Sequence, residues 1–310
     1  MTAKKYEPEQ AAEPGEALTP LSVAETIAGY RETAEFKRVI SAVIDDRLSL
    51  FLTGDAGTGK STLLRRLIEE SRARGRCVAV LAPTGCAAVN VGGQTLHSFF
   101  GIPPRFVTPH ETINSRNRQM LRDLDTLIID EVSMVRSDVM AAVDRALRSA
   151  RRDFRSAFGG LQLVLVGDLA QLPPVVRKEE AAFFSAEYPG PYFFQTGEFP
   201  REHFSLVELQ EPFRHRDDRF REILAGIRNN SVTPDDLTDL NQRVDDRNDL
   251  VFRNTTVTLT GKNNTANDIN AMMLDQLPGP SFRFEAVVEG SFPESFHPVD
   301  DLLLLKPGAK

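Results

Sequence analysis

Eight consecutive residues have the composition and spacing of a loop that binds phosphate. The segment follows a short apolar run and precedes a helical pattern, which is the setting that makes this motif specific. Glycines let successive backbone N–H groups turn inward around phosphate oxygens, and the start of the helix adds its positive end. We therefore predict a nucleoside-triphosphate site built from Gly54, Asp55, Ala56, Gly57, Thr58, Gly59, Lys60 and Ser61.

Four polar side chains could complete this site. Lys60 is expected to reach the β and γ phosphates, and Ser61 to bind Mg²⁺ through its hydroxyl. Asp130 ends an apolar run and is expected to hold the metal, while Glu131 would be the general base that polarises water. An ordinary acidic turn is the alternative for this pair. The sequence lacks an Asn-Lys-x-Asp element for reading guanine, which favours ATP over GTP.

A glutamine follows another apolar run, in the segment Val-Gly-Asp-Leu-Ala-Gln-Leu-Pro-Pro at 166–174. An amide beside the acidic pair can hydrogen-bond the γ phosphate or its water and so report whether the phosphate is present. We therefore predict a catalytic role for Gln171. A simple turn is the alternative.

The elements that must position these residues form an alternating pattern. Apolar runs at 48–52, 77–81, 124–129 and 161–166 are separated by helical periodicities, among them 34–46 and 62–73. Such a pattern is typical of an α/β fold with a parallel sheet covered on both faces. Every polar motif comes at the carboxyl end of a run, where ligands bind in open α/β sheets.

The second half of the chain shows a further set of elements. We expect strands at 204–209 and 255–260, helices at 217–229 and 265–277, and an apolar strand beginning at 302. These elements predict a second α/β unit. The amino-terminal residues contain few large apolar side chains and are expected to be disordered.

Bulk composition narrows the class of protein. The 310 residues carry a net charge of −7, which argues against binding of nucleic acid by bulk positive potential but allows a local groove. No apolar stretch could span a bilayer or serve as a signal peptide, so we expect no membrane partner and a cytoplasmic location. Cys77 and Cys86 are expected to be reduced and buried.

Several motifs in order resemble those of superfamily-one helicases of the PIF type, which are related to RecD. The resemblance rests on the phosphate loop, Ala-Pro-Thr-Gly-Cys-Ala-Ala at 82–88, Gln-Thr-Leu-His-Ser-Phe-Phe at 94–100, Ile-Asp-Glu-Val-Ser-Met at 129–134 and the Gln171 segment. The segments Phe-Gly-Gly-Leu-Gln at 158–162 and Leu-Gln-Glu-Pro-Phe-Arg at 209–214 are similar to further family motifs.

The resemblance implies roles that the residues alone do not. Thr84 and Gly85 would contact the backbone of single-stranded DNA, and His97 with Ser98 would line the same groove. For Phe99 and Phe100, core packing is the alternative to stacking on a base. Arg214 would cross to the γ phosphate from a second domain, with a surface salt bridge as its alternative.

The resemblance also implies an architecture and an activity. We expect a disordered tail over 1–30, a RecA-like ATPase domain over 31–203 and a partial second RecA-like domain over 204–310, with two more family motifs beyond Lys310. The activity would be an ATP-dependent helicase or translocase of DNA repair, recombination or replication, moving 5′ to 3′ as a monomer. The alternatives are a P-loop ATPase not coupled to DNA and a truncated nucleotide- or DNA-binding module. Phe36 stands where relatives often have an adenine-reading Gln.

Overall fold

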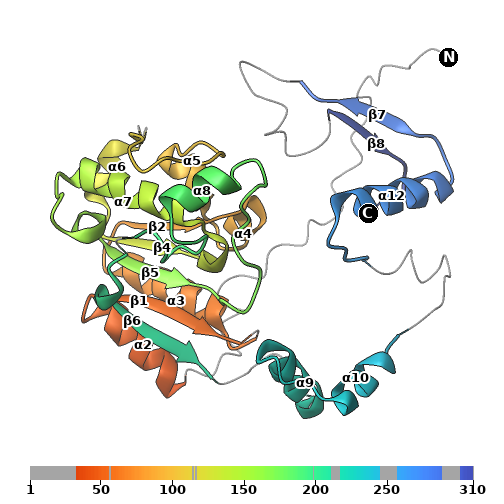
Figure 1. The fold of residues 1–310 in the computed structure, drawn as a ribbon, viewed down its shortest axis with the longest axis horizontal. Helices are drawn as coiled ribbons and strands as arrows, with labels where there is room; N and C mark the ends of the chain where they lie inside the picture. Colours follow the sequence, from red (N-terminus) through yellow and green to blue (C-terminus); the bar gives the residue numbers. More distant parts are fainter. Residues whose placement is uncertain are drawn as a thin grey trace. The chain divides into compact units, whose positions relative to one another are not determined.

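A computed structural model describes residues 33–55, 57–113, 115, 117–197, 199–210, 217–244, 257–287 and 301–309. The chain divides into two compact units between Thr233 and Pro234. The larger unit is built on a six-stranded sheet with helices on both faces (Figure 1). The predicted α/β fold class is confirmed.

The sheet of the larger unit is parallel throughout, with the strand order β3-β2-β4-β5-β1-β6. Its last strand pairs with β1 over six residues, from Ser49 opposite Phe204 to Gly54 opposite Leu209. The expected boundary after residue 203 therefore does not coincide with the observed division, because β6 belongs to the first sheet. The strands are β1 Ser49–Gly54, β2 Val78–Ala82, β3 Gln94–Thr95, β4 Thr126–Ile129, β5 Gln162–Val166 and β6 Phe204–Leu209.

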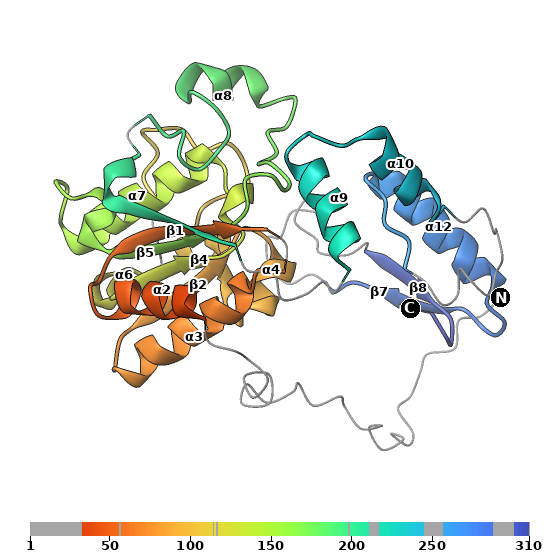
Figure 2. The same ribbon diagram turned by 90° about the horizontal axis from the view of Figure 1, so that it is seen from below.

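Helices cover the two faces of this sheet. α2 and α3 pack on one face and α7 on the other (Figure 2), and α5 and α6 lie on the same side as α7 (Figure 1). The helices are α2 Ala34–Ile44, α3 Lys60–Ala73, α4 Gly85–Asn90, α5 Leu96–Phe100, α6 Arg118–Asp123, α7 Ser137–Arg151, α8 Ala181–Glu187 and α9 Asp218–Arg228, with 3-10 turns at Val132–Met134, Ala157–Gly160 and Arg201–His203.

Two hydrophobic cores result, one on each side of the sheet. Strand residues alternate between them, so that Leu127 and Ile129 of β4 face the α7 side while Ile128 faces α2 and α3. Phe36 is buried in the second core, where apolar positions of α2 recur at three and four residues. Both cores are buried over the length of the central strands, which fixes where the strands end and hence where their polar loops begin.

A buried ion pair fastens the segment after β4 to the start of α7. Asp138 is fully buried and accepts hydrogen bonds from the Arg136 guanidinium at 2.9 and 2.7 Å and from the backbone N–H of Val107 at 3.0 Å. Arg136 also pairs with Glu180 at 2.8 Å. Every oxygen of Asp138 thus has a partner, which is the condition under which a buried charge is tolerated.

Replacing Asp138 with alanine is expected to lower the free energy of unfolding by about 3 kcal/mol, because it leaves part of a buried cation and a backbone N–H without an acceptor. Urea denaturation measures this change. Arg66→Ala is the control, since the Arg66–Glu70 pair of α3 is partly exposed and its loss should cost at most about 0.5 kcal/mol. A cost for Asp138→Ala no larger than the control's would contradict the proposed importance of this network.

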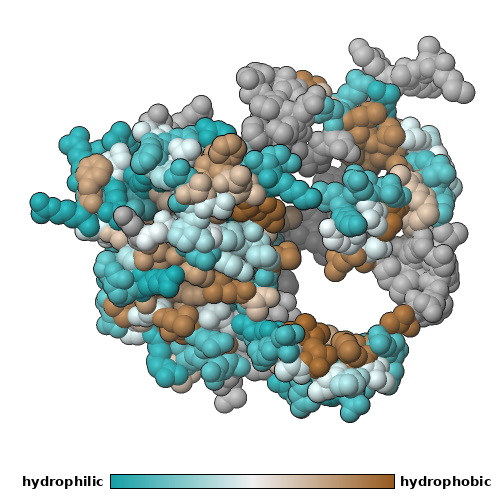
Figure 3. Space-filling model, viewed as in Figure 1, coloured by the Kyte–Doolittle hydropathy of each residue, from teal (hydrophilic) through white to brown (hydrophobic). Residues whose placement is uncertain are grey.

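The smaller unit has little interior in its described part. It contains α10 Pro234–Asn241, α12 Asn263–Gln276 and the antiparallel pair β7 Phe282–Glu285 and β8 Leu302–Leu305. Asp236 is the sole buried residue among those described here, and the β7–β8 pair exposes apolar side chains that appear brown at the upper right of Figure 3. Its described elements therefore have no hydrophobic core of their own.

Two expectations, one about secondary structure and one about exposure, are wrong. Residues 257–260, the described part of the expected strand at 255–260, form no strand, and Val257 and Leu259 are exposed. Cys77 and Cys86 are free thiols as expected, but both are exposed because one precedes β2 and the other lies in the first turn of α4.

Over the described ranges, no helix combines the length and the apolar composition needed to cross a bilayer.

Candidate functional site

The predicted phosphate loop connects β1 to α3 and is shaped by two glycines. Gly54 ends β1 with φ of 145°, and a Cβ there would lie 2.6 Å from the carbonyl oxygen of Leu209 in β6. Gly59 precedes α3 with φ of 84°. Both conformations are rare for residues with a side chain, so the spacing of the motif reflects backbone geometry. Ala56 lies outside the described residues, and Gly57 and Thr58 continue the loop.

Lys60 points into this loop. Its Nζ donates to the carbonyl oxygens of Gly54 at 2.7 Å and Asp55 at 3.0 Å. Burial lowers the pKa of Lys60, and the nearby carboxylates of Asp168 and Glu131 oppose that shift. The ammonium group thus lies where a phosphate inside the loop would meet it. Ser61, exposed in the first turn of α3, follows directly.

The acidic pair follows β4, the neighbour of both β2 and β5. The backbone N–H of Asp130 donates to the carbonyl of Leu81 at 2.9 Å, which ties the end of β4 to β2. Burial raises the pKa of Asp130 to about 6, and the charge of Glu131 adds to the shift, while the Glu131 backbone N–H and Lys60 oppose it. An oxygen donor set of a carboxylate and a hydroxyl, Asp130 with Ser61, suits Mg²⁺.

Glu131 has an unusual backbone conformation. Its φ of 51° and ψ of 40° lie in the left-handed region, which a residue with a side chain seldom adopts. The 3-10 turn that follows holds it there through the bond from Met134 N–H to the Glu131 carbonyl at 3.0 Å. Such strain is often found at functional sites, where the surrounding structure keeps a side chain in place.

Gln171 lies after β5, and its side chain is fixed by Asp168. The Gln171 amide Nε2 donates to Asp168 Oδ2 at 3.0 Å, and its backbone N–H donates to the Asp168 carbonyl at 3.0 Å. Burial works to raise the pKa of Asp168, but hydrogen bonds from Arg228, the Ala170 N–H and Gln171 outweigh it and leave the pKa lowered. Asp168 is therefore a carboxylate at neutral pH.

An arginine that the sequence did not single out also reaches this site. Arg228, the last residue of α9, pairs with Asp168 at 2.5 Å and with Asp55 of the phosphate loop at 2.8 Å. The helical pattern predicted α9 but gave no reason to choose Arg228 from its surface. Arg214, which the resemblance did single out, lies in 211–216, outside the described residues.

The segments expected to contact DNA meet in a cavity of about 180 Å³. Its walls include Thr84 and His97 together with Pro173 of the Gln171 loop and Met134 of the turn after Glu131. Gly85 and Ser98 are exposed next to these two residues in the chain. Burial lowers the pKa of His97 against the opposing charge of Asp138, so the ring is neutral at neutral pH.

Two aromatic residues beside His97 do not take part in this cavity. Phe99 and Phe100 are buried in the core under α5, with their ring centroids 5.2 Å apart. Core packing, the alternative weighed for both, is therefore correct, and Phe99 is not available to stack on a base. Their burial anchors α5 and so fixes the position of His97 two residues earlier.

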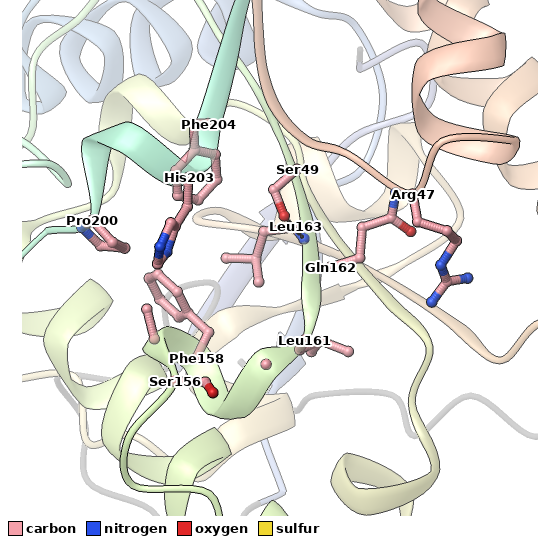
Figure 4. Close-up of a pocket in the computed structure, with 12 residues that line it drawn as sticks. Arg47, Ser49, Ser156, Phe158, Leu161, Gln162, Leu163, Pro200, His203 and Phe204 are labelled. Carbon is pink, nitrogen blue, oxygen red and sulfur yellow. Dashed lines mark hydrogen bonds between the residues drawn. The ribbon is translucent and has the colours of Figure 1, made fainter.

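A second cavity, of about 320 Å³, lies at the opposite edge of the sheet (Figure 4). Ser49, Gln162 and Phe204, from the starts of β1, β5 and β6, line it along with the segment 156–161. Gln162 is structural: its Nε2 donates to the carbonyls of Val43 at 2.8 Å and Leu48 at 3.0 Å. The Phe158–Gln162 motif thus holds β5 against α2 and lies far from the phosphate loop, which is at the carboxyl ends.

Comparisons with known proteins agree with this arrangement. The family described as PIF1-like helicase matches residues 31–198, more than half of the chain. The chain is 31% identical over 283 residues to the ATP-dependent DNA helicase RRM3 of Saccharomyces cerevisiae, covering 88% of this chain and 37% of that protein. It is 32% identical over 284 residues to the human ATP-dependent DNA helicase PIF1, covering 88% and 42%.

A solved structure gives the same result at the level of the fold. The Pif1 helicase from Bacteroides in complex with ADP-AlF3 and ssDNA is similar with a TM-score of 0.75 and 37% identity, over 89% of this chain and 64% of that one. The chain thus spans less than half the length of the two curated relatives above. The order of its motifs, its parallel sheet and these matches together show that the chain belongs to the PIF1-like helicase family.

Proposed function

We propose that this chain binds ATP with Mg²⁺ at the β1 loop, hydrolyses it, and couples hydrolysis to movement along single-stranded DNA. Its relatives RRM3 and human PIF1 are ATP-dependent DNA helicases, which supports this activity for the protein as a whole. Repair, recombination or replication would be its setting, with movement from 5′ to 3′ and action as a monomer.

Each of the candidate site residues would have a separate role in ATP hydrolysis. Lys60 and the N–H groups of the loop hold the phosphates, and Ser61 with Asp130 would hold Mg²⁺, which when bound neutralises phosphate charge. Glu131, adjacent to the metal-holding Asp130, accepts the proton of the attacking water. Gln171 orients that water or the γ phosphate, and Arg214 is the candidate for stabilising the charge that develops there.

The observation that carries the coupling to DNA is the cavity described above. One cavity is lined by Thr84 and His97 and by the two loops that follow Glu131 and Gln171. A DNA strand that contacts Thr84 and His97 would therefore also contact the loops that follow Glu131 and Gln171, the two residues proposed to act at the γ phosphate. A threonine hydroxyl suits a phosphate oxygen, and a neutral imidazole can stack on a base and donate one hydrogen bond.

The variant Thr84→Ala with His97→Ala tests this role. We expect it to weaken binding of single-stranded DNA by about 10- to 100-fold, which corresponds to losing one stacking contact and one phosphate contact. Basal ATP hydrolysis without DNA should stay within about twofold, because Thr84 follows β2 and His97 lies in α5, whereas the phosphate loop follows β1. Fluorescence anisotropy of a labelled oligothymidylate measures the first quantity and phosphate release the second.

The control addresses the second task of Thr84, which is to cap α4 by accepting from the Ala87 N–H at 3.3 Å. Thr33 caps α2 in the same way, through the Phe36 N–H at 3.2 Å, on the face of the sheet away from the cavity. Thr33→Ala should therefore lose a cap but keep DNA affinity. Equal losses of hydrolysis and DNA binding in the double variant would mean that the segment is structural.

A further inference from the structure

One guanidinium group joins two loops of the nucleotide site. Arg228 Nη1 lies 2.5 Å from both carboxylate oxygens of Asp168, and its Nε lies 2.8 Å from Oδ1 of Asp55. The Arg228 side chain is 22% exposed and that of Asp168 is 3% exposed, so this pair is largely shielded from solvent, whereas the Asp55 side chain is 52% exposed. Short, partly buried, charge-assisted contacts of this kind are among the stronger polar interactions in proteins.

Asp168 contacts both Arg228 and the candidate catalytic residue Gln171. Its carboxylate is 3% exposed and accepts from Arg228, from the Ala170 N–H at 3.0 Å and from Gln171 Nε2 at 3.0 Å. Within the part of the chain that the structure describes, Asp168 is the sole recorded partner of the Gln171 side chain, which is otherwise exposed. The orientation of Gln171 thus depends on a carboxylate that Arg228 holds from the other side.

Arg228 belongs to an element that comes after the sheet. α9 begins at Asp218, beyond the last strand β6, and presents Arg228 at its carboxyl end. Any displacement of α9 would therefore pull on Asp168 and, through it, on Gln171. A phosphate entering the loop would also bring negative charge next to Asp55 and Asp168, whose interaction with Arg228 would then have to readjust.

We propose that Arg228 is a positioning residue that acts through Asp168 on Gln171, so that the position of α9 sets the orientation of the side chain that faces the γ phosphate. The inference rests on the proposed function for the role of Gln171 alone. It assigns to the segment after β6 a task in hydrolysis that is separate from that of Arg214.

A double-variant cycle tests this proposal. Arg228→Ala should lower kcat for ATP about tenfold while the KM for ATP stays within about twofold, because a residue that acts on Gln171 affects the reacting phosphate more than ATP binding. In a Gln171→Ala background the same change should alter kcat by less than about twofold, since the side chain through which Arg228 acts is gone.

Two further variants separate position from charge and from folding. Arg228→Lys keeps the charge but cannot bond both oxygens of Asp168 and Asp55 in the same fork geometry, so it should recover part of the lost kcat. Arg219→Ala removes an arginine of the same helix whose recorded ion pair is with Glu222 of α9, and it should leave kcat within about twofold.

The outcomes that would overturn the proposal are distinct from those that would overturn the proposed function. A full tenfold loss in the Gln171→Ala background, or a KM change with unchanged kcat, would mean that Arg228 acts directly on the nucleotide. A second measurement needs no turnover: it is the ratio of the affinity for ADP with aluminium fluoride to the affinity for ADP alone. Arg228→Ala should lower this ratio about tenfold. An unchanged ratio would also overturn the proposal. An ATP hydrolysis rate that is the same with and without DNA would instead overturn the proposed function, and the double-variant cycle of Arg228 and Gln171 would remain valid.

Discussion

Lys60→Ala should reduce ATP turnover by at least about 10³-fold. The Lys60 ammonium lies within the phosphate loop and donates to two of its carbonyl groups, whereas the nearby Arg228 guanidinium is paired with the carboxylates of Asp55 and Asp168. Alanine removes the charge that would meet the β and γ phosphates. Phosphate release under saturating ATP measures the effect.

The control for this prediction lies on the same helix. Arg65 is exposed on α3, and its replacement with alanine should leave turnover within about twofold, because it lies away from the loop. A Lys60→Ala protein that folds as judged by thermal unfolding, yet retains a tenth of its turnover, would show that the loop is not the hydrolytic site.

Glu131→Gln should lower kcat by about 10²- to 10⁴-fold and leave ATP affinity nearly unchanged. Glutamine preserves the size of the side chain but cannot take a proton from water. It also leaves the left-handed backbone at this position, which the turn at Val132–Met134 maintains, no more strained than before. Single-turnover hydrolysis and equilibrium binding of a fluorescent ATP analogue give the two quantities.

The neighbouring residue supplies the matched comparison. Asp130→Asn should raise the concentration of Mg²⁺ needed for half-maximal activity, because a metal-holding carboxylate becomes a neutral amide, whereas Glu131→Gln should not. Identical behaviour of the two variants, with the same shift in Mg²⁺ requirement, would contradict the separate roles assigned to the pair.

The sequence predicted where four candidate catalytic residues lie in the sheet, for a physical reason. Apolar runs of a parallel sheet are buried on both faces, so they stand out, and the polar residues that end them are placed by the sheet itself. Lys60, Asp130, Glu131 and Gln171 therefore lie at the carboxyl ends of three neighbouring strands, as the alternation predicted. Their chemical roles remain predictions.

Other features depend on contacts that periodicity does not encode. The place of β6 beside β1 follows from its pairing with a strand some 150 residues earlier in the chain, and a run of alternating residues fits a second sheet equally well. Arg228 is one of several arginines on an amphipathic helix, and it is distinguished by its distance from Asp168 alone. Sequence spacing gives no such distance.

The proposed coupling between ATP and DNA is tested most directly by ATP hydrolysis of the protein with and without single-stranded DNA. Saturating oligothymidylate should raise kcat by at least about fivefold, the lower end of common coupling between two sites. The Thr84→Ala, His97→Ala protein should need far more DNA to reach that rate. Equal rates with and without DNA would contradict the proposal that hydrolysis is coupled to movement along a strand.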